Sequence, residues 1–156
     1  FASIQELDEY LDAMQKAIDF LKPHIPQEAV EEKLGKVVIG TVQGDIHDIG
    51  KGIVATMLGV YGFEVHDLGR DVPIEKFIEK TKEVNADIVA SSALMTTTMV
   101  AQNLLEEALQ EAGIRERVKT MVGGAAVTQG WADQIGADGY AEEVTEAVEK
   151  ARIFMR

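Results

Sequence analysis

Apolar residues recur at alternating steps of three and four near the start of the chain, which predicts one amphipathic helix over residues 3–21. The segment KPHIP at 22–26 should end this helix, and residues 27–34 have the pattern of a short second helix that ends before Gly35. An apolar helix face needs partners, and two helices make an incomplete bundle. We therefore expect residues 1–35 to be an N-terminal helical cap segment that is truncated in this chain.

From Lys36 onward, short apolar runs alternate with amphipathic segments, which is the pattern of a repeated strand, turn and helix. Strands are expected at 36–42, 63–67, 87–92, 118–122 and 137–140. Helices are expected at 49–61, 73–84, 98–112, 128–135 and 142–154. The first and third strands are apolar without alternation, as in strands that are covered on both faces.

Such units predict an α/β domain over residues 36–156, with a flavodoxin-like (Rossmann-type), doubly wound, five-stranded parallel sheet. The expected strand order is 2-1-3-4-5. In such a sheet, ligands bind beyond the carboxyl ends of the strands, at the switch between strands 1 and 3. The loops that follow these strands are therefore where chemistry is expected.

Composition and charge argue against some classes of binding partner and metal site. The chain has 156 residues and a formal net charge of −12, which argues against binding to a phosphate backbone. It contains no cysteine, which excludes disulfides and thiolate metal sites. No apolar run approaches the roughly 20 residues that span a membrane. We expect a cytoplasmic protein with no nucleic-acid or membrane partner.

The stretch GDIHDIGKG at 44–52 lies at the first strand-to-helix turn and places a histidine between two aspartates, Asp45 and Asp48. It is not a phosphate-binding loop, because the spacing of its glycines is wrong and two carboxylates would repel a phosphate. The dinucleotide pattern GxGxxG is absent after strand 1, and strand 3 does not end in the aspartate of a phosphorelay receiver. We expect Asp48 to cap the helix 49–61 with its carboxylate.

Small and hydroxyl-bearing residues follow strands 3 and 4, in the segments SSALMTTTM at 91–99 and MVGGAAVTQG at 121–130. Small residues at strand ends let a large group approach the backbone, so we infer a slot between sheet and helices with His47 at its mouth. Asp45 is close enough to accept the second ring N–H of His47, an arrangement that fixes the tautomer of a metal-binding histidine. One histidine cannot hold a free metal ion, but it can bond to a metal that is already held in a macrocycle.

Three motifs on the predicted loops resemble the signature of cobalamin-binding domains. They are D-x-H-x-x-G (Asp45, His47, Gly50), S-x-L (Ser92, Leu94) and G-G (Gly123, Gly124). The chain over residues 36–154 is most similar to the small corrinoid proteins of anaerobic methyl transfer, which serve methylamine, methanol, betaine or methoxyaromatic pathways. The cobalamin module of methionine synthase is also similar.

The resemblance implies that His47 is the lower axial ligand to cobalt and replaces the cofactor's own benzimidazole. It implies that Asp45 bonds to the far ring nitrogen and that Thr98 extends this relay, at a position where methionine synthase has serine. It also implies a set of residues that contact the corrin or its nucleotide tail. Beyond Asp45, His47 and Thr98, these are Asp48, Gly50, Ser92, Leu94, Thr96, Gly123, Gly124 and Tyr140.

By the same resemblance, the chain is a non-catalytic methyl carrier that holds methylcobalamin when loaded. Its partners would be a substrate:corrinoid methyltransferase, an acceptor methyltransferase that uses coenzyme M or tetrahydrofolate, and a reductive activation protein. Three alternatives stay open from sequence: a cobalamin-based sensor domain, the cobalamin subunit of a mutase, and a flavodoxin-like module that binds no cobalamin.

Overall fold

The computed structural model describes residues 4–21 and 34–156. The chain divides into two compact units, Phe1–Val30 and Glu31–Arg156. The described part of the first unit is a single helix, α1 (Ile4–Leu21), in agreement with the helix expected over 3–21. The second helix, expected over 27–34, falls outside the described residues except for Leu34. That residues 1–35 form a truncated cap therefore stays a prediction.

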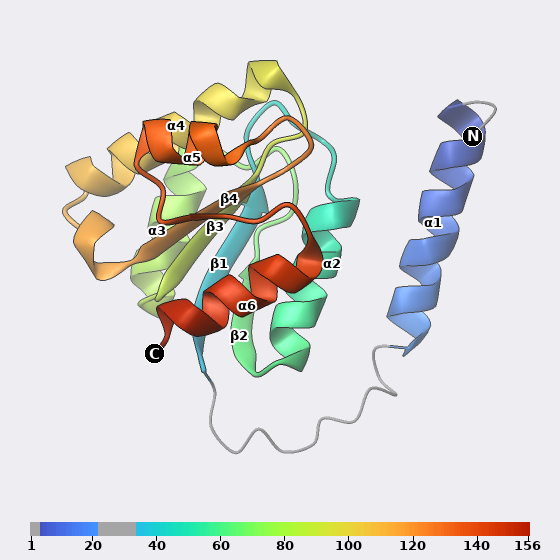
Figure 1. The fold of residues 1–156 in the computed structure, drawn as a ribbon, viewed down its shortest axis with the longest axis horizontal. Helices are drawn as coiled ribbons and strands as arrows, with labels where there is room; N and C mark the ends of the chain where they lie inside the picture. The colour runs from blue at the N-terminus through green and yellow to red at the C-terminus, as the bar shows by residue number, and fades with distance from the viewer. Residues whose placement is uncertain (1–3, 22–33) are drawn as a thin grey trace. The chain divides into compact units, whose positions relative to one another are not determined.

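The second unit alternates strands and helices along its whole length (Figure 1). Its strands are β1 (Gly35–Thr41), β2 (Phe63–Asp67), β3 (Ile88–Ser92), β4 (Lys119–Gly123) and β5 (Gly139–Tyr140). Its helices are α2 (Ile49–Val60), α3 (Ile74–Val84), α4 (Thr96–Glu111), α5 (Gln129–Ile135) and α6 (Val144–Phe154), with a 3₁₀ turn η2 (Arg115–Arg117). The strands are all parallel in the order β2-β1-β3-β4-β5, which confirms the predicted flavodoxin-like sheet.

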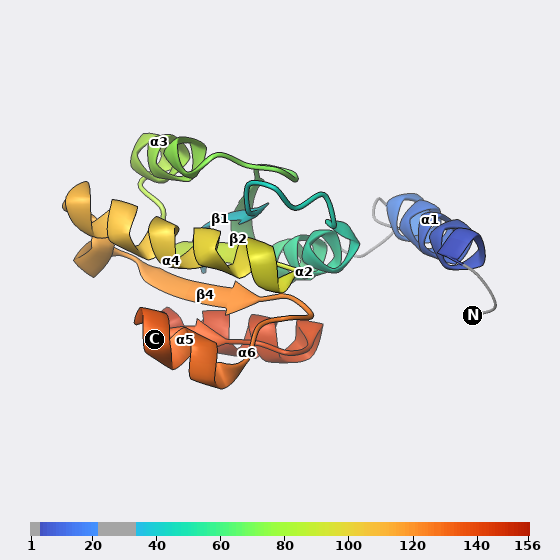
Figure 2. The same ribbon diagram turned by 90° about the horizontal axis from the view of Figure 1, so that it is seen from above.

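Two apolar layers enclose the sheet, and strand alternation decides which side chains enter each layer. On one face, Ile39, Ala90 and Met121 pack with α2 and α6, which lie next to each other in Figure 1. On the other face, Val38 and Val89 pack with α3 and α4. Viewed from above, α3 and α4 lie on one side of the strands and α6 on the other (Figure 2). Burial on both faces explains why the first and third strands are apolar throughout.

The register of the central strands aligns the residues that end them. Thr41 pairs with Ser92, and Ser92 pairs with Gly123. Each of the three lies two residues after a member of the α2 and α6 layer, so all three face that layer. The carboxyl ends of β1, β3 and β4 therefore present a row of small residues on one face of the sheet.

Several predicted boundaries differ from the structure. Helix α4 begins at Thr96 rather than at residue 98, because Met95 is its N-cap residue and Thr96 and Thr97 already take helical conformation. Strand β5 has two residues rather than four, since only Gly139 and Tyr140 pair with β4. Helix α6 begins at Val144 rather than at residue 142. Among the described helices, none combines the length and apolar character needed to cross a membrane.

Candidate functional site

A buried carboxylate organises the loop that follows β1. This loop, residues 43–48, is called the His loop below. The side chain of Asp45 has no exposed surface and accepts four hydrogen bonds. Its Oδ1 accepts from the ring Nδ1–H of His47 at 2.8 Å and from the His47 backbone N–H at 3.1 Å. Its Oδ2 accepts from the Leu94 backbone N–H at 2.7 Å and from the Thr98 hydroxyl at 2.8 Å.

These donors decide the charge state of Asp45. Burial alone would raise the pKa of the carboxyl, because a buried charge loses its hydration. The hydrogen bonds from Leu94, His47 and Thr98 favour the ionised form more strongly, and together they lower the pKa of Asp45 from 3.8 to about 2. Asp45 is therefore a carboxylate at any physiological pH, and it can only accept hydrogen bonds.

The ionised carboxylate fixes the tautomer of His47. Because Asp45 can only accept, Nδ1 of His47 carries the proton of their 2.8 Å hydrogen bond. The neutral ring then has its lone pair on Nε2, which has no hydrogen-bond partner within residues 4–21 and 34–156. The side chain is half exposed, at 50%. His47 therefore presents an electron pair at the surface of the domain while its other nitrogen is held from within.

The other two donors come from the β3 side of the switch point. Leu94 lies in the turn after β3, and Thr98 is a buried residue in the first turn of α4. The Thr98 hydroxyl also lies 3.0 Å from the Met95 carbonyl oxygen, so its single proton has two acceptors in reach. Thr98 thus bonds to Asp45, as the resemblance to cobalamin-binding domains implied. The contact of Leu94 was not predicted, because it is made by a backbone N–H.

The structure also brings in residues that the sequence did not single out. Thr41, which is fully buried at the end of β1, donates from its hydroxyl to the His47 carbonyl oxygen at 3.0 Å. Lys51, in the first turn of α2, is almost completely buried and pairs with Asp67 at 2.6 Å. A lone lysine within the apolar sequence IGKGIVATMLGV was a signal for such a pair. Thr41 carried no signal, because threonine is common in buried strands.

The two glycines after β4 differ in their surroundings. Gly124 has a φ of +120°, and a Cβ built there would lie 1.9 Å from the Ala93 carbonyl oxygen. No other residue fits this position, since the contact is with backbone. A Cβ on Gly123 would lie 3.2 Å from the Ala141 carbonyl oxygen, a tight but less severe contact. Gly124 is thus required where its backbone approaches the backbone of Ala93. Gly123 ends the row that begins with Thr41 and Ser92 and adds no side chain to it.

The remaining predicted residues are not joined to the Asp45–His47 pair. Asp48 is the N-cap residue of α2, but its side chain makes no capping hydrogen bond, so the prediction of carboxylate capping is wrong. Its backbone carbonyl accepts from the Gly52 N–H at 2.7 Å, the first hydrogen bond of the helix. Gly50 is exposed, with open space where a Cβ would stand, and Thr96 is exposed at the start of α4.

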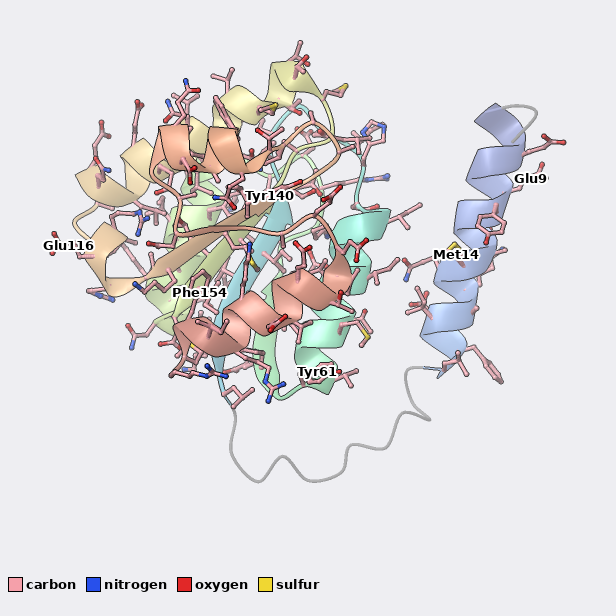
Figure 3. All side chains as sticks on the ribbon, viewed as in Figure 1. Glu9, Met14, Tyr61, Glu116, Tyr140 and Phe154 are labelled. Carbon is pink, nitrogen blue, oxygen red and sulfur yellow. The ribbon has the colours of Figure 1, made fainter. Side chains whose placement is uncertain are left out.

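Tyr140 ends β5 and is half-buried (Figure 3). Its ring packs with Val122 and Ala132, and the ammonium of Lys150 lies 6.0 Å from the ring centroid. Burial, followed by the charges of Glu142 and Glu146, raises the pKa of its hydroxyl. Tyr140 is therefore neutral and lies beside the Gly123 end of the row, away from His47.

The donor set fits a metal that arrives already coordinated. Among the described residues, no group of three or more His, Asp or Glu side chains is arranged to hold a metal ion. His47 offers one nitrogen, and the carboxylate nearest to it is occupied by four donors. A cavity of about 330 Å³ lies elsewhere, between α2 and α6, and is lined by residues such as Met57, Tyr61 and Arg152. It contains none of the predicted site residues.

Comparisons with known proteins place the chain among related sequences. The sequence profile of the B12 binding domain matches residues 35–149. The dimethylamine corrinoid protein of Methanosarcina barkeri is 61% identical over 141 residues, which are 90% of this chain and 66% of that protein. Trimethylamine corrinoid protein 1 of Methanosarcina acetivorans is 61% identical over 145 residues, which are 92% of this chain and 67% of that protein.

Solved structures give the same result. The monomethylamine corrinoid protein of Methanosarcina barkeri superposes with a TM-score of 0.80 at 40% identity and covers 92% of this chain and 68% of that one. The methanol:cobalamin methyltransferase complex from Methanosarcina barkeri gives a TM-score of 0.75 at 34% identity, covering 98% of this chain and 58% of that chain. The chain spans about two thirds of the length of the dimethylamine and trimethylamine corrinoid proteins named above.

Proposed function

The chain belongs to the B12 binding domain family and binds cobalamin, and from this premise we propose that it is a methyl carrier in which His47 is the lower axial ligand to cobalt. The observation that carries the proposal is the state of the imidazole. Nδ1 is bonded to a buried carboxylate at 2.8 Å, and Nε2 is left with an available lone pair on a half-exposed ring.

In this proposal Asp45 holds the ring and raises its donor strength. A carboxylate that accepts the distal N–H makes an imidazole more basic at the other nitrogen and restricts its rotation. Thr98 and the Leu94 N–H keep Asp45 ionised by bonding to its second oxygen. The Thr41 hydroxyl holds the backbone of His47 through the carbonyl oxygen. These residues are proposed to set how strongly Nε2 binds to the metal.

The nucleotide tail of the cofactor is proposed to lie along the row Thr41, Ser92 and Gly123. This row is on the face of the sheet covered by α2 and α6, and Ser92 and Gly123 are only partly buried. The Ser92 hydroxyl makes no hydrogen bond within the described residues, so it has a donor to offer. Gly50, Leu94, Thr96, Gly124 and Tyr140 are assigned to the surroundings of the corrin and tail as proposals, as is Asp48.

Bound cobalamin would supply the chemistry by which a carbon–cobalt bond forms and breaks. The residues of this chain would orient the cofactor and bind its lower face, while partner enzymes would present the methyl donor and acceptor. The names of the relatives support a methylamine as the donor class, and dimethylamine and trimethylamine corrinoid proteins are equally identical to the chain. We accordingly propose a methylamine-type substrate:corrinoid methyltransferase as the first partner, without choosing among methylamines.

The second half of the cycle is also proposed. Release of the methyl group needs an acceptor methyltransferase, with coenzyme M (a thiol) or tetrahydrofolate (an amine) as the acceptor. When the cofactor becomes oxidised, a reductive activation protein is needed to reduce it again. Similarity to a chain of the methanol:cobalamin methyltransferase complex supports a carrier that docks onto a methyltransferase. Its identity of 34% is lower than that of the methylamine relatives, so methanol is the less favoured donor.

The test is His47→Ala, with His66→Ala as the matched control. His66 is the other described histidine, and its ring lies 3.6 Å from the Glu64 carboxylate, on β2. Both variants are mixed with hydroxocobalamin and desalted, and the absorbance spectrum of the bound cofactor is recorded. His47→Ala should retain cofactor through the tail but show a changed spectrum, and His66→Ala should match the parent. An unchanged spectrum for His47→Ala would show that the axial ligand lies elsewhere.

A further inference from the structure

The segment that follows β2, residues 68–72, contains an unusual backbone conformation. Asp71 has a φ of +51°, and within the described residues only Asn85, with a φ of +55°, is another non-glycine residue in the left-handed region. Asp and Asn enter this region at lower cost than other side chains, because their short polar groups form local hydrogen bonds. Such a conformation persists only where its surroundings hold it, so the contacts of Asp71 indicate what it supports.

Asp71 contacts the His loop through its side-chain carboxylate and through its backbone N–H. Its carboxylate Oδ1 accepts from the Gly44 backbone N–H at 2.8 Å. Its own backbone N–H donates to the Asp45 carbonyl oxygen at 2.9 Å. Gly44 itself has a φ of +88°, so this is a position where the chain has unusual conformational freedom. Asp71 thus fixes the two residues that immediately precede Ile46 and His47.

A second contact from the same edge of the sheet holds the first turn of α2, the helix that follows the loop. The ammonium of Lys51 lies 2.6 Å from Asp67 Oδ1, and only 3% of the lysine side chain is exposed. Asp67 also accepts from the Gly69 backbone N–H at 2.9 Å. This pair ties the first turn of α2 to the end of β2. The start of the His loop and the first turn of α2, which follows the loop, are therefore both tied to residues 67–71, which carry none of the predicted site residues.

We propose that Asp71 is a positioning residue for His47, which prepares the imidazole for axial ligation by holding Gly44 and Asp45. The inference rests on the proposed function of His47. A ligand that is held in its bound geometry before binding loses less conformational entropy when it binds. Without the hydrogen bond from Gly44 to the Asp71 carboxylate, the peptide at Gly44 regains freedom, and part of that freedom must be lost again each time His47 ligates the metal.

Three substitutions separate the acceptor from the backbone conformation. Asp71→Gly keeps the left-handed conformation but removes the acceptor for Gly44. Asp71→Asn keeps both, because asparagine tolerates a positive φ and has a carbonyl oxygen at the same place. The matched control is Asn85→Gly, since Asn85 also has a positive φ and accepts one hydrogen bond, from Arg117 at 3.0 Å. Asn85 ends α3, before β3 begins, far along the chain from the His loop.

Two readouts test the proposal. The first is amide hydrogen exchange at residues 44–47 in corrinoid-free protein, together with the urea unfolding midpoint. The second is the ratio of histidine-ligated to unligated cob(II)alamin in the loaded protein, from its electron paramagnetic resonance spectrum. Asp71→Gly should speed exchange and lower this ratio about fivefold, the effect of one lost hydrogen bond. Asp71→Asn should stay within twofold of the parent, and Asn85→Gly should change neither the exchange at residues 44–47 nor the ligation ratio.

The failures of the two proposals are distinguishable. If Asp71→Gly matches the parent in both readouts, or if Asn85→Gly produces the same changes, Asp71 has no positioning role. If the parent itself shows no histidine ligation, the proposed function of His47 fails. Faster exchange at 44–47 in Asp71→Gly with an unchanged ligation ratio would also overturn the inference, because the loop would then be held by Asp71 without consequence for ligation.

Discussion

Two buried carboxylates lie in different parts of the domain and are held in opposite ways. Asp45 follows β1 and is surrounded by neutral donors, and its pKa is lowered to about 2. Glu106, on α4, contacts Arg115 at 2.5 Å, yet burial outweighs the arginine and raises the pKa of Glu106. At Asp45 the hydrogen bonds outweigh the effect of burial, whereas at Glu106 the Thr120 hydrogen bond and the arginine do not.

The hydrogen-bond networks around the two carboxylates also differ in whether they leave a polar group available to bind a ligand. Arg115 donates to Val118, Thr120 and Gly136 in addition to Glu106, and it lies 3.1 Å from Asp138. This network joins α4, η2, β4 and the segment before β5, and its charged groups Glu106, Arg115 and Asp138 pair with one another. The Asp45 network ends instead at Nε2 of a half-exposed imidazole. A closed network is typical of a structural role, and an open one of a ligand site.

The largest expected effect comes from breaking the closed network. Arg115→Met leaves Glu106 buried without its charged partner and should lower the free energy of unfolding by about 3 kcal/mol. Urea denaturation at neutral pH measures this loss. Adding Glu106→Gln should recover part of it, because the buried carboxylate is then gone. If the comparison holds, the spectrum of bound cobalamin stays as in the parent, and a changed spectrum would show that the two networks are coupled.

The next effect concerns the pH dependence of stability in corrinoid-free protein. The pKa of Asp45 is about 2 when folded and 3.8 in an unfolded chain. Because the folded value is lower, the contribution is fully present above the unfolded pKa and is lost as the pH falls through the folded pKa. It amounts to about 2 kcal/mol. Asp45→Asn should therefore be less stable than the parent at pH 6, and this gap should narrow by about that amount near pH 2.

The carboxylates that both proteins share cancel in this difference. Urea denaturation of the parent and Asp45→Asn at a series of pH values between 6 and 2 gives the gap directly. A gap that stays constant over this range would mean that the four donors do not shift the titration of Asp45. The charge state assigned to the open network would then be wrong.

The smallest change in stability is expected when the Thr98 hydroxyl, which donates to Asp45, is removed. Thr98→Ala removes one of four donors to Asp45 and should cost about 1 kcal/mol of stability. Thr98→Ser keeps the hydroxyl and should remain within about 0.5 kcal/mol of the parent. The comparison of the two by thermal or urea unfolding separates the hydrogen bond from side-chain packing. Equal losses in both variants would assign the effect of Thr98 to its methyl group.

Sequence alone predicted the sheet and the main neighbours of His47, because both follow from local patterns. Apolar runs gave the four longer strands to within one residue of their bounds. The short spacing of Asp45 and His47 fixed their contact, and the turn after β3 had to lie beside them at the switch point. The pairing of Thr98 with Asp45 followed from the resemblance to cobalamin-binding domains.

The contacts that depend on backbone geometry could not be predicted from sequence. The Leu94 N–H bonds to Asp45 whatever its side chain, so no residue pattern indicates it. The positive φ of Asp71 results from tertiary contacts with Gly44 and Asp45. Asp48 has a residue type that favours capping, but the structure leaves its carboxylate without a capping hydrogen bond.

The claim that Nε2 of His47 bonds to cobalt is tested most directly by isotope labelling. The protein is produced with ¹⁵N-histidine, loaded with unlabelled cob(II)alamin, and examined by electron paramagnetic resonance. A nitrogen-14 axial ligand splits each cobalt line into three, and a nitrogen-15 ligand splits it into two. We predict splitting into two for labelled protein and into three for unlabelled protein. Splitting into three in both samples would mean that the cofactor's own benzimidazole remains bound, and the account of His47 would be wrong.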